Sequence, residues 1–152
     1  MSRISIDEIR DICETQLPWV VSQGMAVEEL GEGTCRIRLP YREEYLRPGG
    51  TLSGPTLMGL ADFAVYVGVL SMIGRVELAV TINLTCNFLR RPKPADVIAD
   101  CRIIKIGKRL AYGEVFLYSE ADPEAGPVAH VTSTYSIPPD HAPPEASPMP
   151  GR

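Results

Sequence analysis

Histidine and cysteine are scarce in this sequence. The two histidines and four cysteines are widely spread, and no CxxC or Cys/His spacing joins them. Structural zinc sites and disulfide frameworks both need such closely spaced residues. We therefore expect no metal site. We interpret Cys86 and Cys101, which lie in apolar strand-like runs, as reduced thiols of the core.

A basic excess and a signal peptide are lacking as well. The formal net charge is −4, so we expect no basic face of the strength that general nucleic-acid binding needs. The first eight residues carry charges where a secretory signal would have an apolar run. With the sparse cysteines, these absences predict a cytoplasmic protein that does not bind nucleic acid.

A membrane-spanning run is also missing. A span needs about 20 apolar residues without a charge. The long apolar stretch at residues 57–73 is shorter, contains Asp62 and includes two glycines. We expect the buried helix of a soluble protein here, and no association with a membrane.

Asp62 is the most informative residue that the sequence does contain. It is the only charged side chain between Arg47 and Arg75. Burying a carboxylate among apolar residues is costly unless it has a partner. The sequence therefore predicts that Asp62 meets a partner, a substrate or a proton. The alternative to a catalytic role is a structural pairing across an interface.

Residues 1–20 predict a short amphipathic helix packed on a larger domain. Ser5 and Glu8 have the spacing of a capping box. One apolar stripe follows at Ile9, Ile12 and Cys13. Pro18 is expected to end this helix.

Residues 21–137 predict one domain that begins with strands and a helix. Two short strands are expected between residues 25 and 39, followed by an irregular loop at 40–50. A helix is expected from Pro55 to Ile73, with Gly74 as its stop.

After this helix, apolar and polar residues alternate along the sequence, with a period of two. Residues 79–88 predict a half-buried strand. Its apolar face would carry Val80, Ile82, Leu84, Cys86 and Phe88, and its polar face Thr81, Asn83, Thr85 and Asn87. Further strands are expected at 97–106, 110–118 and 128–137, and the short turns between them indicate an antiparallel meander.

The central helix is apolar on every side, so it must be covered on every side. An antiparallel sheet wrapped around it satisfies both elements, which predicts an α+β fold. The tail at residues 138–152 contains six prolines and is predicted to be disordered.

The stretch Arg47-Pro48-Gly49-Gly50-Thr51-Leu52-Ser53-Gly54-Pro55, followed by Leu60-Ala61-Asp62, resembles a family signature. The family is the PaaI-type acyl-CoA thioesterases, whose signature is roughly Asn-Pro-x-Gly-x-x-His-Gly-Gly and then Leu-Ala-Asp. Residues 81–92 resemble the next strand of that family, and residues 107–109 resemble its Gly-Arg/Lys turn. The resemblance covers about residues 20–137. It implies the hotdog fold, an antiparallel sheet wrapped around a long central helix.

The resemblance also implies an activity. The backbone N–H of Gly54 would polarise the thioester carbonyl, and Asp62 would act as nucleophile or as general base on water. In such folds the two groups come from different subunits, so a homodimer is implied, with a dimer of dimers (a homotetramer) as the expected assembly. The substrate would be an acyl-CoA, with coenzyme A as part of the substrate and no separate cofactor.

Three positions depart from the family signature. Arg47, Ser53 and Pro55 stand where the family has Asn, His and the second Gly. Ser53 is a catalytic candidate that would hydrogen-bond a substrate oxygen or a water, and its alternative role is to cap the helix. Pro55 has no N–H, which leaves Gly54 as the main donor at this helix end.

Seven residues are candidates for substrate binding: Arg47, Asn83, Phe88, Arg90, Arg91, Lys108 and Arg109. The loop cations would contact the phosphates of coenzyme A, or else be ordinary loop charges. Asn83 would line the ligand channel of a dimer, or else face solvent. Phe88 would help enclose the acyl chain or the pantetheine.

Two other functions fit the same fold. One is a non-catalytic acyl-CoA-binding protein, because the altered loop would have lost turnover and kept affinity. The other is a hotdog hydratase or dehydratase, but that chemistry typically uses an Asp/His pair at the helix start, where this chain has Ser53.

Overall fold

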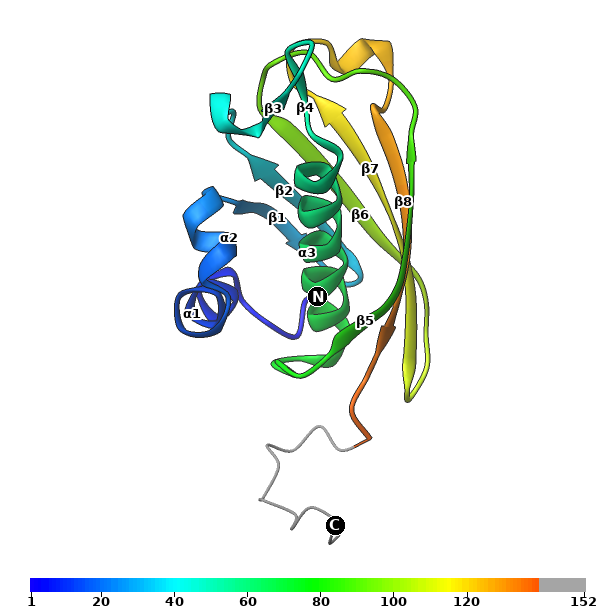
Figure 1. The fold of residues 1–152 in the computed structure, drawn as a ribbon. Helices are drawn as coiled ribbons and strands as arrows, with labels where there is room; N and C mark the ends of the chain where they lie inside the picture. Colours follow the sequence, from blue (N-terminus) through cyan, green and yellow to red (C-terminus); the bar gives the residue numbers. More distant parts are fainter. Residues whose placement is uncertain (140–152) are drawn as a thin grey trace, which may run out of the picture.

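A computed structural model describes residues 1–139 of the chain. One antiparallel sheet curves around a central helix, α3 (Gly54–Ile73), as Figure 1 shows. This arrangement confirms the predicted α+β hotdog architecture. Most of the predicted Pro-rich tail, including His141, lies outside the described residues.

The central helix α3 begins and ends where its local signals predict. Ser53 caps its N-terminus, a proline follows in the first turn, and Gly74, with φ of 88°, ends it. By length and composition α3 passes for a membrane span, yet 67% of its most apolar window is buried inside the protein. It is therefore the core helix that the sequence predicts.

Packing around α3 dominates the core. Leu60, Val65, Val67 and Leu70 of α3 have no exposed surface. We predict that Leu70→Ala lowers the free energy of unfolding by about 3 kcal/mol, because it removes apolar contacts and leaves a cavity. Urea denaturation measures this, with Met58→Ala as the matched control. Met58 lies on the same helix but is 38% exposed, so its loss is expected to cost less than about 1 kcal/mol.

The main sheet contains six strands in the order β1-β2-β6-β7-β8-β5. They are β1 (Ala26–Gly31), β2 (Thr34–Leu39), β5 (Val80–Phe88), β6 (Val97–Ile106), β7 (Leu110–Ser119) and β8 (Ala129–Ser136). The predicted strands are all present. The predicted four-strand meander is wrong in one respect: β6, β7 and β8 follow one another, but β5 pairs with β8 and forms an edge of the sheet.

The crossover from β5 to β6 explains this difference. Residues 89–96 connect the edge strand to β6, passing the ends of β8 and β7 (Figure 1). Three strand spacings are about 14 Å, which eight extended residues easily cover. The prolines at 92 and 94 keep this segment out of the sheet, since proline cannot donate to a ladder.

A β-bulge in β5 corrects the predicted faces of this strand. The register shifts between Thr81 and Asn83, so Ile82 is an extra residue. The strand therefore changes phase: Thr81 faces α3, while Val80 and Ile82 are each 59% exposed. The expected apolar face that included both residues is thus interrupted, because a bulge turns successive side chains differently from a regular strand.

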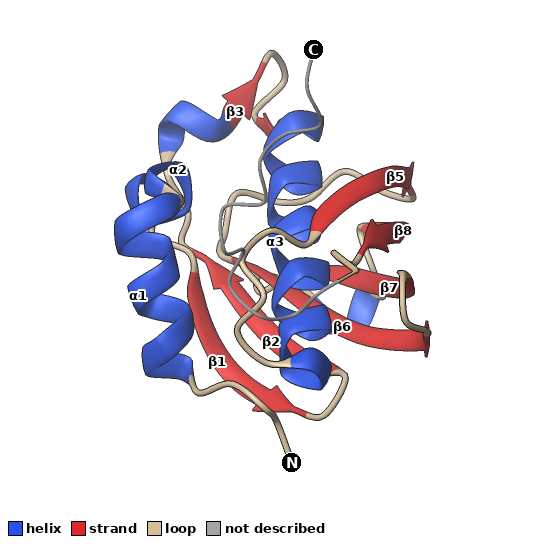
Figure 2. Ribbon diagram, turned by 90° about the horizontal axis from the view of Figure 1, so that it is seen from below, coloured by secondary structure: helices blue, strands red, loops and turns tan. Residues whose placement is uncertain are grey.

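Two helices precede the sheet, α1 (Ile6–Gln16) and α2 (Pro18–Gln23). The predicted capping box at Ser5 is present, and Ile9, Ile12 and Cys13 are the buried residues of α1, as expected. Pro18 ends α1 but also begins α2, which the sequence did not predict. Figure 2 shows both helices beside β1, next to α3. Because α2 crosses residue 20, the division into segments 1–20 and 21–137 stays a prediction.

The connection from β2 to α3 is more regular than the predicted loop. It contains a short 3-10 helix, η1 (Glu43–Tyr45), and a small hairpin of β3 (Leu46–Arg47) and β4 (Thr51–Leu52). Gly49 and Gly50 form its turn with φ of 96° and 72°. Another 3-10 turn, η2 (Pro123–Ala125), joins β7 to β8.

Candidate active site

Asp62 projects from the middle of α3 toward β5 and β8. Its Oδ1 accepts hydrogen bonds from the Thr81 hydroxyl at 2.6 Å and the Tyr135 hydroxyl at 2.8 Å. Within residues 1–139, no hydrogen bond reaches its other carboxylate oxygen, Oδ2. Asp62 is half-buried, less than the sequence suggests, because its side chain borders a cavity. One oxygen is thus fixed and the other is available to a ligand or water.

Tyr135 is the more deeply buried of the two donors. Its side chain is 3% exposed, and its hydroxyl also lies 2.9 Å from the Asp62 backbone carbonyl. Burial, together with the nearby Asp62 charge, raises the pKa of Tyr135 far above its usual value. The phenol therefore stays protonated and remains a hydrogen-bond donor to the carboxylate.

Thr81 reaches Asp62 because of the bulge in β5. Thr81 belongs to the face predicted to be polar. In a regular strand its side chain would be on the other face of the sheet from those of Leu84 and Cys86. In the structure, Leu84 and Cys86 are half-buried, as is Thr81. Bulges are frequent beside active sites, where they redirect a side chain.

A cavity of about 200 Å³ adjoins the Asp62 carboxylate. Its remaining walls are mostly apolar or aromatic: Leu17, Trp19, Phe63, Tyr66, Glu77, Ala79, Val80, Thr81 and Tyr135. Leu17 and Trp19 come from the N-terminal helical segment, so this segment is part of the site. Burial raises the pKa of Tyr66 to about 12, and its hydroxyl donates to the Glu77 carbonyl.

The N-terminus of α3 lies beside a second cavity, of about 430 Å³. Gly54 and Phe88 line it together with Arg47, Arg90 and Arg91. These five predicted site residues are thus brought together. A Cβ on Gly54 would lie 3.1 Å from the Phe88 ring, so the glycine is needed for close packing as well as for ligand approach.

The donors at this helix end are already partly assigned. Ser53 Oγ accepts from Thr56 N at 3.4 Å and contacts Thr56 Oγ1 at 2.7 Å, which confirms its role as the helix cap. Pro55 has no N–H. In the described chain the Gly54 N–H donates no hydrogen bond. This single donor, with the positive end of the helix dipole, is therefore available to an anionic oxygen.

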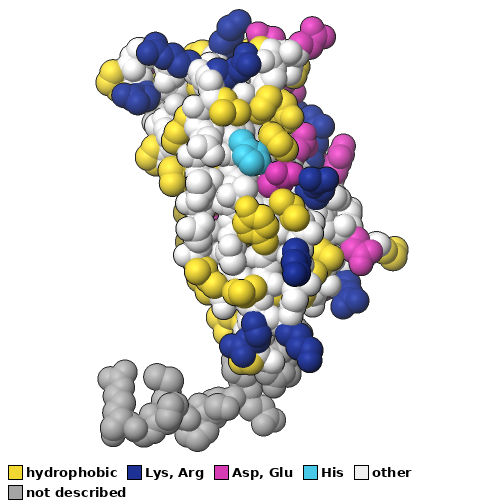
Figure 3. Space-filling view, turned by 90° about the vertical axis from the view of Figure 1, so that its right-hand side faces the viewer, with side chains coloured by type: hydrophobic (Ala, Val, Ile, Leu, Met, Phe, Trp, Pro, Cys, Tyr) yellow, Lys and Arg dark blue, Asp and Glu magenta, His cyan; other side chains and the backbone are white. Residues whose placement is uncertain are grey.

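The basic candidates separate into two groups. Arg90 and Arg91 follow β5, whereas Lys108 and Arg109 form the turn between β6 and β7. In the pairing of β5 with β8, Val80 is opposite Ser136, which is near that turn. Phe88 is opposite Ala129, at the other end of these two strands. The two groups therefore lie at opposite ends of the sheet, and Figure 3 shows basic side chains at both ends of this face.

Asn83 and Arg47 lie apart from each other. The side-chain oxygen of Asn83 accepts a long hydrogen bond from the Thr85 hydroxyl at 3.5 Å. Asn83 is exposed beyond the bulge, and its backbone carbonyl accepts from Ser133 at 2.8 Å. Arg47 makes none of the ion pairs found in residues 1–139, and the nearby Glu44 pairs with Arg42. Arg47 therefore lines the second cavity without an ion-pair partner among the described residues.

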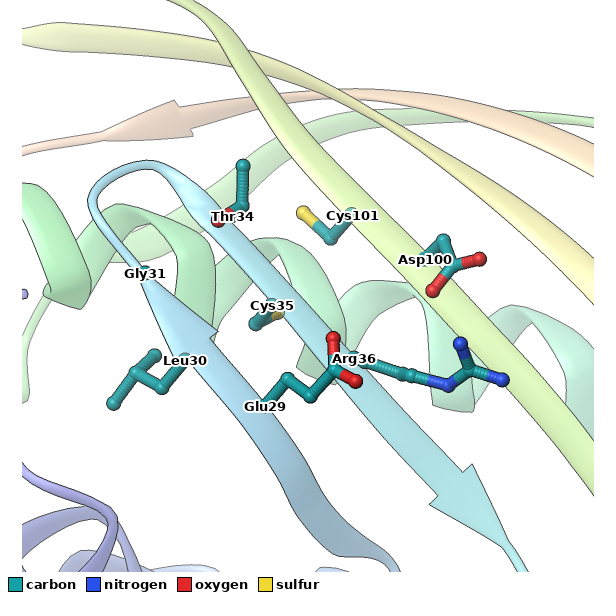
Figure 4. A pocket seen from close by; sticks show the side chains of 8 residues that line it. All are labelled: Glu29, Leu30, Gly31, Thr34, Cys35, Arg36, Asp100 and Cys101. Atoms are coloured by element: carbon teal, nitrogen blue, oxygen red, sulfur yellow. The ribbon is translucent and has the colours of Figure 1, made fainter.

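Two other polar features lie outside these cavities. His130 contacts Glu114 at 3.0 Å on the outer face of the sheet, and this bond lowers the pKa of Glu114. Figure 4 shows a hollow over β1, β2 and β6 in which Cys35 lies beside Cys101. Both thiols are free and buried. The neighbouring Cys101 and burial raise the pKa of Cys35, so the Cys35 thiol is not an activated nucleophile.

Within residues 1–139, no group of three His, Cys, Asp or Glu side chains is arranged to hold a metal ion. The site therefore consists of a carboxylate, hydroxyls, one backbone donor and arginines.

Sequence reasoning missed Tyr135, Tyr66 and Trp19. A signal for Tyr135 was present: residues 129–136 alternate, and Tyr135 is in phase with the apolar Val131. A buried carboxylate needs donors, and a tyrosine on the inward face of a strand is an obvious source. Trp19 has no such signal, because its approach to Asp62 depends on α2, which was not predicted.

Tyr135→Phe tests the positioning of Asp62. We predict that it lowers kcat about tenfold with little change in KM, because the carboxylate loses one donor. Tyr45→Phe is the matched control: it removes another buried hydroxyl, which donates to the Gln23 carbonyl. A stable Tyr135→Phe protein with an unchanged kcat, or with equal changes in kcat and KM, would contradict the assignment.

The chain belongs to the thioesterase superfamily, whose family model matches residues 49–125. That segment runs from the β3–β4 hairpin through α3 to η2, beyond the end of β7, and it includes Gly54 and Asp62. The family's general activity is the hydrolysis of thioesters, which agrees with a site made of a carboxylate and a helix N-terminus.

Particular relatives agree with this assignment. A solved structure from Silicibacter sp. TM1040, named "putative thioesterase", is 39% identical with a TM-score of 0.80, covering 91% of this chain and 95% of that one. A Halobacterium salinarum protein named "putative esterase" is 31% identical over 104 residues, or 65% of this chain and 68% of that protein. The E. coli PaaI protein shares the fold, with a TM-score of 0.74 at 17% identity over 87% of this chain and 91% of that one. The predicted PaaI-like hotdog fold is thus confirmed.

Proposed function

We propose that this protein hydrolyses an acyl-CoA thioester to the free acid and coenzyme A, and that it acts in the cytoplasm. The observation that carries the proposal is the state of Asp62. Thr81 and Tyr135 hold Oδ1, while Oδ2 has no hydrogen bond within residues 1–139, and Asp62 lines a cavity whose walls are mostly apolar or aromatic. A carboxylate arranged in this way is suited to activate a water or to attack a carbonyl carbon.

The reaction needs an oxyanion donor as well. The Gly54 N–H stabilises the negative charge that develops on the thioester oxygen, a contribution of about 3 kcal/mol in a comparable hydrolase. Asp62 takes a proton from the attacking water, which adds to the carbonyl carbon and gives the free acid. Alternatively Asp62 adds to the carbonyl carbon itself, which leaves the acyl group on Asp62 as an anhydride that a water then hydrolyses to the free acid. In both routes the C–S bond breaks, and the sulfur of coenzyme A leaves as a thiolate that takes up a proton. Ser53 acts through the helix cap, which fixes the first turn.

A single protomer does not place both groups on one carbonyl. Gly54 and Asp62 are eight residues apart on one helix, which is about 12 Å along its axis. We therefore propose a homodimer in which Gly54 of one subunit meets Asp62 of the other. The exposed edge strand β5 is the proposed contact, because Val80, Ile82 and Phe88 are each more than half exposed along it. Two such dimers would form the homotetramer.

The phosphates of coenzyme A would bind the cations beside Gly54. Arg47, Arg90 and Arg91 line the cavity at the helix N-terminus. Arginine suits phosphate because its planar guanidinium donates two hydrogen bonds at once. In the dimer, Lys108, Arg109 and Asn83 would come from the partner subunit to the same ligand, since they are distant from this cavity within one protomer.

The test compares acyl-CoA substrates with the same acyl groups on N-acetylcysteamine, which lacks the phosphates. Thiol release is measured for wild type and for the double variant Arg90→Ala/Arg91→Ala. We predict that the variant raises KM for acyl-CoA about tenfold or more and leaves hydrolysis of the truncated thioester unchanged. Arg10→Ala is the control, because Arg10 pairs with Asp7 on α1. Hydrolysis of neither class by wild type would contradict the proposal.

A second candidate is an acyl-CoA-binding protein without turnover. The observation in its favour is the helix start, where Ser53 is committed to the cap and Pro55 offers no N–H. Calorimetry with acyl-CoA separates the two functions: tight binding by wild type with no thiol release would support binding alone.

A further inference from the structure

The cavity beside Asp62 is closed on one side by a segment that lies outside the stretch matched to the family. Leu17 and Trp19 line this cavity together with Asp62 and Phe63, while the family match begins at residue 49. Trp19 is also the sole tryptophan of the sequence. A large, rigid aromatic side chain at this place determines how far the cavity extends.

Several contacts hold Trp19 in position. Pro18 fixes the first turn of α2, and Val20, which is 1% exposed, anchors the helix in the core. The indole meets the Phe63 ring edge to face, with centroids 6.5 Å apart and an interplanar angle of 81°. A Cβ on Gly59 of α3 would lie 3.6 Å from the indole. The ring thus packs against α3 one turn before Asp62, while 39% of its surface stays exposed.

We propose that Trp19 is a specificity-determining residue: its ring forms the wall that limits the size of the acyl group accepted beside Asp62. This inference rests on the proposed thioesterase function and adds the substrate class, which is compact acyl groups. The cavity of about 200 Å³ compares with an apolar cavity of about 150 Å³ that holds benzene, so about eight non-hydrogen atoms fit. Longer chains would collide with the indole.

The first experiment measures kcat/KM for a series of straight-chain acyl-CoAs from butanoyl to dodecanoyl. Wild type should be most active on chains up to about eight carbons. Trp19→Ala should raise the ratio of dodecanoyl to butanoyl activity about tenfold or more, because the pocket gains room for extra methylenes. Trp19→Phe keeps a ring against Phe63 and should give an intermediate ratio, which guards against poor folding of the alanine variant.

Val21→Ala is the matched control for this series. Val21 lies on the same short helix, is 49% exposed and does not line the Asp62 cavity. The ratio of dodecanoyl to butanoyl activity in Val21→Ala should stay within about twofold of the wild-type ratio. An equal change in all three variants would show a general effect of α2 and would overturn the role of the indole.

The second experiment needs no turnover. The emission of the sole tryptophan is recorded while Asp62→Asn protein is titrated with octanoyl-CoA and, separately, with coenzyme A. Octanoyl-CoA should shift the emission to shorter wavelength, because its chain displaces water from the indole, and coenzyme A alone should not.

The outcomes distinguish the inference from the function on which it rests. Thioester hydrolysis with an unchanged chain-length ratio in Trp19→Ala, or binding of octanoyl-CoA with no change in emission, would overturn the inference and leave the function standing. If wild type neither binds nor hydrolyses any acyl-CoA, the function and the inference both fail.

Discussion

Replacing Asp62 by asparagine is expected to lower kcat for thioester hydrolysis about a thousandfold. The amide is the same size and still accepts hydrogen bonds from Thr81 and Tyr135 on its oxygen. It has no negative charge, however, and neither takes a proton from water nor attacks a carbonyl. The measurement is thiol release under saturating acyl-CoA.

Binding should survive this change, because the arginines and the apolar cavity walls are intact. We expect the Kd for acyl-CoA to remain within about threefold of wild type. Asp7→Asn on α1 is the matched control, since it makes the same chemical change at an exposed residue. An Asp62→Asn enzyme that keeps more than about a tenth of wild-type kcat would show that another group performs the chemistry.

Gly54→Pro is the second change with a large expected effect. Proline removes the backbone N–H of residue 54 and leaves the other hydrogen-bond donors at the start of α3 unchanged. Proline is favoured at the first helical position, and Ser53 has the extended backbone that a residue before proline needs. Residue 54 itself precedes Pro55, whose ring crowds a Cβ at a helical position, so part of the effect is steric. We predict that kcat falls about a hundredfold, the effect of losing one oxyanion donor.

Gly54→Ala is the necessary comparison. Both variants place a Cβ 3.1 Å from the Phe88 ring, but alanine keeps the N–H. Alanine should therefore show only the steric part of the effect, and its kcat should exceed that of the proline variant about tenfold or more. Equal kcat values in two folded variants would exclude the N–H of Gly54 as the donor. Thermal denaturation shows whether each variant is folded.

The sequence predicts those parts of the fold that depend on local signals. The capping box at Ser5, the cap at Ser53 and the stop at Gly74 each involve residues within one turn, so their pattern can be read directly. The central helix is equally clear, because a helix without a polar face must be surrounded. Asp62 stands out for the same reason: its charge has no local explanation.

The remaining features depend on contacts between distant residues. The pairing of β5 with β8 follows from a crossover that leaves no mark on either strand, and the bulge at Ile82 is invisible in an alternating pattern. Both decide that Thr81 faces Asp62. Likewise Pro18 is a stop signal for one helix and a start signal for the next, and only the second role brings Trp19 to the cavity.

The separation of the basic residues was beyond sequence reasoning for a similar reason. Arg91 and Arg109 both lie in loops that adjoin strands of one sheet. Which end of the sheet each loop occupies depends on strand order, and strand order includes the crossover. The chemistry of the residues was therefore readable, but their grouping around Gly54 was not.

The claim that most needs a direct test is that each active centre takes Gly54 from one subunit and Asp62 from the other. Gly54→Pro and Asp62→Asn proteins are unfolded together, refolded as a mixture in equal amounts, and assayed for thiol release. Mixed dimers then hold one intact centre, so activity should return to about a quarter of the wild-type value. Activity that stays at the level of the two separate variants would show that the two groups do not act together across a dimer.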